Sequence, residues 1–174
     1  MMRIIAGEFR SRKIKTLPGL ETRPTPDRLR ETLFNILAPR IEGAVFVDAY
    51  AGTGSVGIEA LSRGASRAIF IERGRAAASV IKENLAELKV AGRAEVLFAN
   101  TLQVIERVNG DIWFLDPPYE LTAEYAAVLD LLGARETALV IVQHSWKLAL
   151  AEEYGKRKRY RMVKQGDNRL SFYE

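Results

Sequence analysis

The chain has 174 residues, of which 48% are hydrophobic, and a formal net charge of +4. A chain of this length can bury about 70% of its unfolded surface, which is enough for one globular domain without cross-links. It has no cysteine, which excludes disulfides, thiolate zinc sites and a cysteine nucleophile.

The N-terminal part, residues 1–40, is predicted to form a basic arm and a helix. "MRIIAGEFRSRKIKTL" alternates short apolar runs with basic residues, which indicates a hairpin or an extended arm. "RPTPDRLRETLFNILAPR" then predicts a helix with Thr25 as its N-cap and Pro26 in its first position. Pro39 is expected to end this helix.

Residues 41–174 alternate predicted strands and helices and are expected to form one domain, packed with residues 1–40 into one compact unit. Ligands of such α/β sheets bind at the carboxyl ends of the strands. The pattern predicts a doubly wound, mostly parallel sheet of seven strands with a C-terminal antiparallel hairpin. The predicted strands cover residues 44–50, 68–72, 94–100, 111–116 and 138–144, followed by two strands around Gly166–Asp167.

The stretch "DAYAGTGSVG" lies between the first predicted strand and the following helix. Its glycines have the spacing G-x-G-x-x-G of a dinucleotide-binding loop, and Glu72 lies 20 residues after Gly52, where an acidic side chain can bind ribose hydroxyls. Asp48, four residues before Gly52, would repel a pyrophosphate but attract the ammonium and sulfonium of S-adenosylmethionine. The loop therefore favours S-adenosylmethionine over a dinucleotide, and a simple tight turn without a cofactor is the third possibility.

Polar side chains end the first four predicted strands: Asp48, Glu72, Asn100 and Asp116. Asp116 is the first residue of the motif "DPPY", in which two prolines fix the backbone after the strand. Asp116 and the Pro117 carbonyl can accept both N–H bonds of an exocyclic amine while Tyr119 stacks on its ring. Two acceptors help the amine lone pair to turn toward a methyl sulfonium, which suits transfer of a methyl group to nitrogen. The only histidine, His144, is expected to be structural, because this chemistry needs no imidazole base.

The basic residues are gathered at the two ends of the chain. Residues 1–40 carry nine Lys and Arg against four Asp and Glu, and residues 156–174 carry seven against two. Such clusters are typical of proteins that bind a polyanion, although ordinary solvated surface has the same composition.

Taken with these motifs, the sequence resembles the RsmD family of 16S ribosomal RNA guanine-N2 methyltransferases, which have a Rossmann-like class I methyltransferase fold. The resemblance covers nearly the whole chain. The D-P-P-Y motif alone is shared by adenine, cytosine, glutamine and guanine amino-methyltransferases. The resemblance is narrowed to this family by the arm together with "RPTPDRLRETLFNIL". It implies S-adenosylmethionine as the cofactor and 16S RNA, in an assembling small subunit, as the partner.

The resemblance also implies roles for individual residues, carried over position by position. The target guanine amine would be held by Asp116, Pro117, Pro118 and Tyr119. The cofactor would be bound by Asp48, Ala51, Gly52, Thr53, Gly54, Glu72, Arg73, Asn100, Thr101 and Asp116. RNA phosphates would be bound by Arg10, Arg12, Lys13, Arg23, Arg28 and Arg30.

Other functions remain open from the residues alone. The same catalytic loop would serve an amino-methyltransferase that acts on adenine in nucleic acid or on a protein glutamine. A dinucleotide-dependent oxidoreductase and an RNA-binding assembly factor without catalysis are alternatives from other classes. No apolar run approaches the ~20 residues of a membrane span, and the N-terminus lacks the apolar segment of a secretion signal. We expect a cytoplasmic monomer with no membrane or metal partner.

Overall fold

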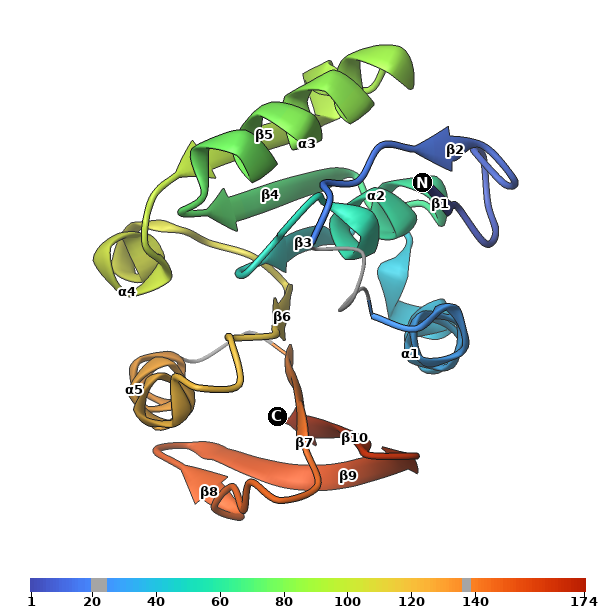
Figure 1. The fold of residues 1–174 in the computed structure, drawn as a ribbon. Helices are drawn as coiled ribbons and strands as arrows, with labels where there is room; N and C mark the ends of the chain where they lie inside the picture. The colour runs from blue at the N-terminus through green and yellow to red at the C-terminus, as the bar shows by residue number, and fades with distance from the viewer. Residues whose placement is uncertain (20–24, 136–138) are drawn as a thin grey trace.

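The computed structural model describes residues 1–19, 25–135 and 139–174, and in these ranges the predicted sheet is present (Figure 1). Its strand order is β5-β4-β3-β6-β7-β10-β9-β8. The five strands from β5 to β7 in this order are parallel, and β10, β9 and β8 continue the sheet antiparallel. The strands are β3 (Val45–Asp48), β4 (Arg67–Glu72), β5 (Ala94–Phe98), β6 (Ile112–Leu115), β7 (Leu139–Ser145), β8 (Glu153–Tyr154), β9 (Arg157–Gln165) and β10 (Asn168–Tyr173).

Seven of these strands are the expected ones, and the two-residue β8 is an addition at the edge of the sheet. It pairs only with the first two residues of β9. Gly166, whose φ of +57° suits glycine, lies in the turn between β9 and β10, as the sequence predicted.

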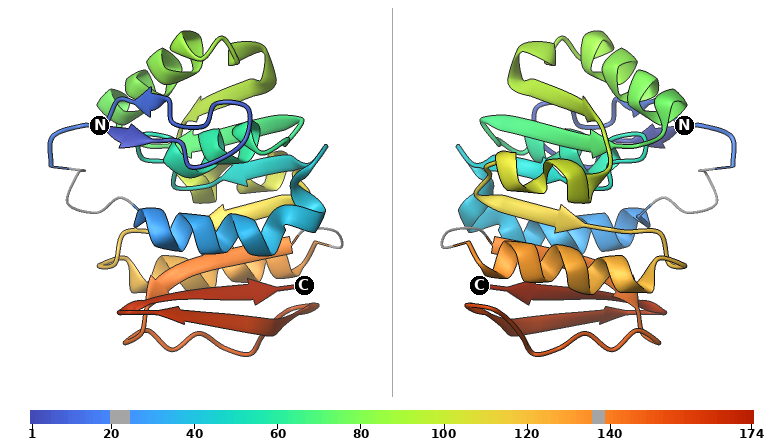
Figure 2. Two further views of the ribbon diagram at one scale, coloured as in Figure 1. Left: turned by 90° about the vertical axis from the view of Figure 1, so that its right-hand side faces the viewer. Right: turned by 90° about the vertical axis from the view of Figure 1, so that its left-hand side faces the viewer.

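Helices cover both faces of the sheet, as expected for a doubly wound fold (Figures 1 and 2). α1, α2 and α3 lie on one face, and α4 and α5 lie on the other. The helices are α1 (Asp27–Ile41), α2 (Ser55–Ser62), α3 (Arg75–Glu87), α4 (Thr101–Val104) and α5 (Thr122–Gly133), with 3-10 turns η1 (Ala91–Arg93) and η2 (Ile105–Arg107).

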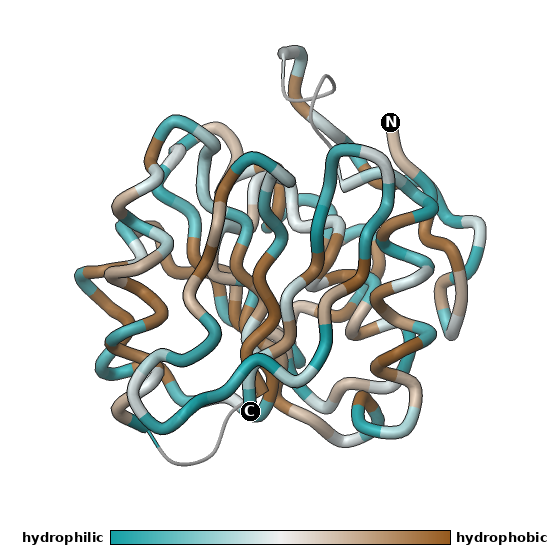
Figure 3. Tube along the Cα trace, turned by 90° about the horizontal axis from the view of Figure 1, so that it is seen from below, coloured by the Kyte–Doolittle hydropathy of each residue, from teal (hydrophilic) through white to brown (hydrophobic). Residues whose placement is uncertain are grey.

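The central strands β3, β6 and β7 are buried on both faces, so they are apolar along most of their length rather than alternating. Hydrophobic residues accordingly gather in the middle of the fold (Figure 3). Phe46 and Phe114 pack with the apolar side of α1, whereas Val47 and Trp113 pack with α5. Each side of the sheet therefore has its own core.

The limits of α1 differ from the sequence prediction at both ends. The helix begins at Asp27, and the Thr25 hydroxyl donates to Gln143 Oε1 (3.2 Å) instead of capping the helix. Pro39 does not end the helix, which continues to Ile41. A proline this close to the C-terminus removes a single backbone hydrogen bond, and the burial of Leu37 and Ile41 holds the last turn in place.

The N-terminal arm contains the predicted hairpin, β1 (Met2–Arg3) paired with β2 (Lys13–Ile14). It packs Ile4, Phe9 and Ile14 against apolar side chains of α2 and α3. The hairpin is thus packed on the folded body.

Candidate active site

The carboxyl ends of four neighbouring strands meet at one edge of the sheet. Asp48 ends β3, Glu72 ends β4, Asn100 follows β5 and Asp116 follows β6. Because β5, β4, β3 and β6 are adjacent in that order, these polar residues form a row across the sheet edge, as predicted.

Two adjoining cavities open at this row, a smaller one of about 260 Å³ and a larger one of about 550 Å³. Tyr50, Gly52 and Asp116 line both. Together the cavities have the size of a site for a cofactor and a second small group. Of the predicted site residues, the smaller cavity is lined by Asp48, Ala51, Gly52, Thr53 and Asp116, and the larger by Gly52, Glu72, Arg73, Asn100, Thr101, Asp116, Pro117, Pro118 and Tyr119.

Each glycine of the loop has a different role. A Cβ added at Gly52 would meet no described atom within 4 Å, so space is open beside the loop where it lines both cavities. Gly54, which was expected to bind the cofactor, lines neither cavity; its φ of +87° turns the chain into α2. A Cβ at Gly57 would lie 2.3 Å from the Phe70 ring, so this glycine allows α2 to pack closely on β4.

Asp48 is a buried carboxyl group, 1% exposed, that accepts the Gly57 amide N–H at 2.9 Å. Burial raises its pKa to about 7, although the hydrogen bond from Gly57 opposes this change. A cation placed beside Asp48 would stabilise the carboxylate, whereas a pyrophosphate would be repelled. The smaller cavity therefore suits the ammonium and sulfonium end of a ligand.

Glu72 faces the larger cavity, and both of its carboxylate oxygens accept backbone N–H bonds, Oε2 from Gly52 (2.7 Å) and Oε1 from Gly74 (2.6 Å). These bonds orient the carboxylate and leave lone pairs for the hydroxyls of a ribose. Asn100 Oδ1 accepts the Leu102 N–H at the start of α4, and the Thr101 hydroxyl donates to the Ala49 carbonyl. The donor set and the open space beside Gly52 thus fit S-adenosylmethionine.

The catalytic loop predicted from "DPPY" also lines the larger cavity. The buried Tyr125 hydroxyl donates to the Pro117 carbonyl at 2.9 Å, and the Tyr119 hydroxyl donates to Asn168 Oδ1 at 3.0 Å. A carbonyl oxygen has two lone pairs, so Pro117 can accept a second N–H beside the one from Tyr125. The loop is held from α5 on one side and from the C-terminal hairpin on the other.

Four residues in or beside the larger cavity were missed by sequence reasoning: Tyr50, Gln143, Asn168 and Tyr125. Tyr50, in "DAYAGTG", donates its hydroxyl to Glu124 Oε1 (2.8 Å), and its burial raises its pKa. Gln143 lies next to His144 near the end of β7, so the rule that ligands bind at strand ends would have found it. Asn168 follows the hairpin turn and Tyr125 is on a helix, and their positions depend on the tertiary fold.

His144 is structural, as expected. Its side chain is buried, with Nε2 2.8 Å from Ser171 Oγ and Nδ1 3.0 Å from the Ser145 carbonyl oxygen. Burial lowers its pKa, so the neutral ring is favoured. It is a residue of β7, opposite Arg169 of β10, and lines neither cavity.

The predicted phosphate-binding residues divide into three groups. Arg10, Arg12 and Lys13 on the arm and Arg28 on α1 are exposed, as an RNA contact requires. Arg23 lies outside the described residues. The prediction for Arg30 is wrong, and its side chain has an internal role.

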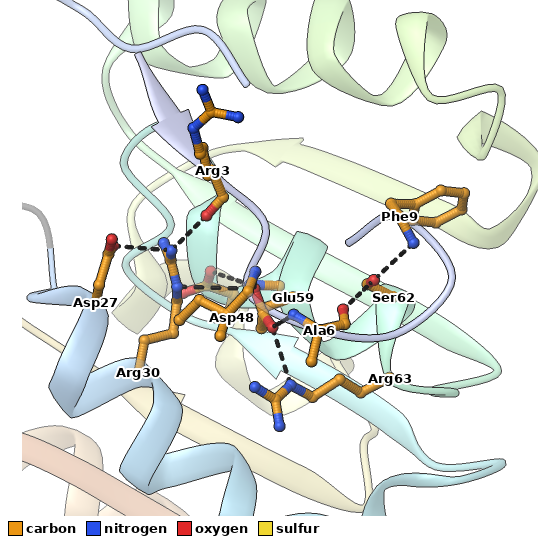
Figure 4. Close-up of polar contacts among 11 residues, drawn as sticks. Arg3, Ala6, Phe9, Asp27, Arg30, Asp48, Glu59, Ser62 and Arg63 are labelled. Atoms are coloured by element: carbon orange, nitrogen blue, oxygen red, sulfur yellow. Dashed lines mark hydrogen bonds and ion pairs between the residues drawn. The ribbon is translucent and has the colours of Figure 1, made fainter. Parts of the chain in front are cut away.

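Arg30 is fully buried beside the carboxylate of Glu59 on α2 (Figure 4). Its Nε lies 3.7 Å from Glu59, and its Nη2 donates to Asp27 Oδ1 (3.0 Å) and to the Arg3 carbonyl (2.7 Å). Burial lowers the Arg30 pKa and the nearby carboxylates oppose this change. The guanidinium therefore joins α1, α2 and the arm through Nη2 and the charge of Glu59, and its complete burial keeps it from a phosphate.

Glu59 is the centre of this cluster. It accepts the Ile5 N–H on Oε2 (2.9 Å) and the Ala6 N–H on Oε1 (3.0 Å), and Arg63 Nε lies 2.9 Å from Oε1. The arm that these bonds hold contributes Met1, Met2 and Thr16 to the lining of the smaller cavity. The buried cluster thus fixes one wall of the site.

Among the helices of the described ranges, none is both long and apolar enough to span a membrane.

A family model described as "Conserved hypothetical protein 95" matches residues 2–174. "Putative rRNA methyltransferase YlbH" of Bacillus subtilis is 34% identical over 163 residues, which cover 88% of each protein. "Ribosomal RNA small subunit methyltransferase D" of Haemophilus influenzae is 40% identical over 132 residues, which cover 73% of this chain and 68% of that protein.

Solved structures agree with the sequence matches. The structure titled "Putative methyltransferase yhhF from Escherichia coli" has a TM-score of 0.87 at 34% identity and covers 99% of this chain and 96% of its own. An RNA methyltransferase from Salinibacter ruber, in complex with S-adenosyl-L-homocysteine, has a TM-score of 0.66 at 15% identity, with 86% and 92% covered, and shows the shared fold. The fold is therefore the α/β methyltransferase fold, and the chain belongs to the RsmD family, whose model matches it over almost its whole length.

Proposed function

We propose that this protein is an S-adenosylmethionine-dependent methyltransferase that modifies the exocyclic N2 amine of a guanine in 16S ribosomal RNA, in an assembling small subunit in the cytoplasm. The relatives named as ribosomal RNA methyltransferases support the RNA substrate. The observation that carries the proposal is the position of Asp116, which lines both cavities and thus faces a cofactor and a target base at once.

The cofactor would lie across the row of strand ends. Its cationic end would face Asp48 in the smaller cavity, and its ribose hydroxyls would face Glu72 in the larger one. S-adenosylmethionine supplies the methyl group as an electrophile. The residues of this chain hold the acceptor nitrogen in line with that group, and positioning of this kind is a large part of catalysis.

The acceptor side is built from the catalytic loop. An arylamine is a poor nucleophile because its lone pair is delocalised into the ring. The Asp116 carboxylate and the Pro117 carbonyl accept its two N–H bonds and stabilise the positive charge that develops on nitrogen during transfer. Tyr125, through its bond to the Pro117 carbonyl, fixes the direction of that acceptor.

Two side-chain amides in the larger cavity support guanine as the base. Gln143 is 3% exposed and Asn168 is half-buried at the start of β10. An amide carries both donors and acceptors, and the guanine edge beside N2 presents an N1–H donor and an O6 acceptor. Adenine presents its exocyclic amine beside an unprotonated N1, so it would match this pair of amides less well.

If the basic arm takes part in binding the substrate, the substrate has to be large and polyanionic. Arg10, Arg12 and Lys13 are exposed on the arm, which also contributes to the smaller cavity. A guanine within folded RNA would have to be flipped out of its stack to reach Asp116. Phosphate contacts on the arm would hold the flanking backbone while the base enters.

The test is to incubate the purified protein and S-adenosylmethionine with small ribosomal subunits that lack this methylation, and to identify methylated nucleosides and methylated protein residues by mass spectrometry. N2-methylguanosine that is absent with Asp116→Ala would support the proposal. N6-methyladenosine would refute the target base, and a methylated glutamine in a ribosomal protein would refute the RNA substrate.

Two further outcomes would refute the enzyme class. Thermal protection by NAD, and none by S-adenosylhomocysteine, would indicate a dinucleotide enzyme. RNA binding that is equal in the parent and in Asp116→Ala, with no methyl transfer by either, would indicate an assembly factor.

A further inference from the structure

The segment after β7 contains an exposed tryptophan whose role the proposed chemistry does not explain. Trp146 is 54% exposed, whereas the other tryptophan, Trp113, is 1% exposed in the core. Exposed large aromatic side chains beside a site are typical of binding surfaces, because their burial by a ligand removes apolar area from water.

The two chain neighbours of Trp146 line a third cavity of about 360 Å³, which is distinct from the two cavities of the row of strand ends. Tyr119 of the catalytic loop lines both this cavity and the larger cavity, so the two spaces share one wall. Trp146 lies in the chain between Ser145 and Lys147, which both line the third cavity. The full lining is Tyr119, Thr122, Tyr125, Ser145, Lys147, Leu148 and Asp167.

The turn that carries Trp146 is held by backbone hydrogen bonds to the C-terminal hairpin and within itself. The Trp146 N–H donates to the Asp167 carbonyl (2.9 Å), and the Leu148 N–H donates to the Ser145 carbonyl (3.0 Å). Asp167 precedes Asn168, which is bonded to Tyr119. The exposed tryptophan and the catalytic loop are therefore fixed to the same hairpin end, and their separation is set by the fold.

The chemistry of this surface fits a nucleotide. Tyrosine rings and the Leu148 side chain offer apolar area, Lys147 offers a cation, and Asp167 can accept from the exocyclic amine of a base. Lys147 Nζ lies 5.8 Å from the centre of the Trp146 ring. Lys164 is exposed opposite Arg169 on the same hairpin, which adds positive charge for a phosphate.

We propose that Trp146 and the third cavity form a second base-binding site, which holds a nucleotide that flanks the target guanine in the RNA. This inference rests on the proposed function, because the site is defined by its shared wall with the target cavity. Stacking on an aromatic ring tolerates any base, so the site would contribute affinity and fix the register of the strand while the target pocket selects guanine.

The test compares Trp146→Ala and Trp146→Phe with Tyr160→Ala. Tyr160 is a matched control: it is 53% exposed, like Trp146, and it lies on β9 six residues from the hairpin turn, about 20 Å along the strand. Loss of one base stack should raise the KM for RNA about tenfold or more in Trp146→Ala and much less in Trp146→Phe. Tyr160→Ala should match the parent protein, and the affinity for S-adenosylhomocysteine should be equal in all four.

Tryptophan fluorescence gives a second readout that does not depend on methyl transfer. RNA oligonucleotides should quench Trp146, and the quenching should vanish in Trp146→Phe, which keeps the buried Trp113. Quenching by RNA would support the site even if no methylation were found, so failure of the proposed function and failure of the site are distinguishable. Equal KM and equal quenching in the parent and the variants would overturn the inference. A defect of Trp146→Ala on assembled particles with none on free RNA would also overturn it, because it would indicate a contact with a ribosomal protein.

Discussion

Replacing Glu59 with glutamine should destabilise the protein strongly, although the two side chains have nearly the same shape. Glu59 is fully buried and accepts hydrogen bonds from two backbone N–H groups of the arm, and it forms ion pairs with Arg30 and Arg63. A glutamine would keep one acceptor oxygen, turn an NH₂ group toward an N–H donor and remove the negative charge beside a buried guanidinium.

The size of the effect follows from the contacts. Removal of one partner from a buried ion pair costs about 3–5 kcal/mol, because the remaining charge is left in a medium of low dielectric. Asp27 stays 3.0 Å from Arg30 and compensates part of its charge, so we expect a value of about 3 kcal/mol. For a domain of this size that is a fall in Tm of about 6–12 °C.

The measurement is thermal and urea unfolding of Glu59→Gln beside Glu95→Gln. Glu95 lies 2.6 Å from Arg67, but both side chains are about half exposed, at 42% and 51%. Breaking such a surface pair should cost less than about 1 kcal/mol. The buried variant should also bind S-adenosylhomocysteine more weakly, because the arm lines the smaller cavity. Equal stability losses in the two variants would refute the view that the buried Glu59 cluster holds the arm.

Three further predictions concern the site. Asp116→Asn should lower kcat by at least about 10²-fold while the calorimetric Kd for S-adenosylhomocysteine changes little, since the carboxylate acts on the amine in the transition state; an equal loss of cofactor affinity would contradict this role. Because the pKa of Asp48 is raised to about 7, its ionised fraction should rise about tenfold between pH 6 and pH 8. The affinity for S-adenosylmethionine should rise by the same factor. A pH dependence of the same size in Asp48→Asn would show that Asp48 is not its source. The stability of the unliganded protein should depend on pH in the opposite direction to its affinity for the cofactor. The raised pKa means that the folded protein keeps the Asp48 proton more readily than the unfolded chain, so the contribution of Asp48 to stability falls as the pH rises from about 4 to 7. Arg10→Ala and Arg12→Ala should each lower the salt slope of RNA binding by roughly 0.7–0.9. Arg10→Ala should leave Tm unchanged, whereas Arg12 also donates to the Glu87 carbonyl (3.0 Å) and Arg30→Gln should lower Tm. An unchanged slope would mean that the two arm arginines do not touch phosphate.

The row of strand-end residues shows how much of the site follows from sequence alone. Four apolar strands each end in a polar residue, and a glycine loop that begins a helix follows the first of them. This pattern predicts a parallel sheet with a ligand site at its carboxyl edge. Parallel strands joined by right-handed crossovers place those ends together whatever the details of packing. For this reason the sequence alone places Asp48, Glu72 and Asp116 at one edge of the sheet.

Charge patterns gave less reliable guidance, and Arg30 shows the reason. In the sequence it stands among other basic residues of the first helix, and the pattern suggested a solvated face for binding phosphate. Its partner Glu59 lies 29 residues further along the chain, on a helix that packs against α1 only in the folded protein. A buried ion pair of this kind has no local sequence signal.

The sequence by itself determined the class of fold and the position of the ligand edge, because each depends on local preference and on the period of the strands. Only the tertiary structure decided which residues complete the walls of the two cavities. Asn168 reaches the larger cavity because β10 runs antiparallel to β7, and Met1 and Met2 reach the smaller cavity because the buried Glu59 holds the arm. Contacts between segments so distant in the chain depend on how whole elements pack, and packing is settled by the sum of many side chains and not by any motif.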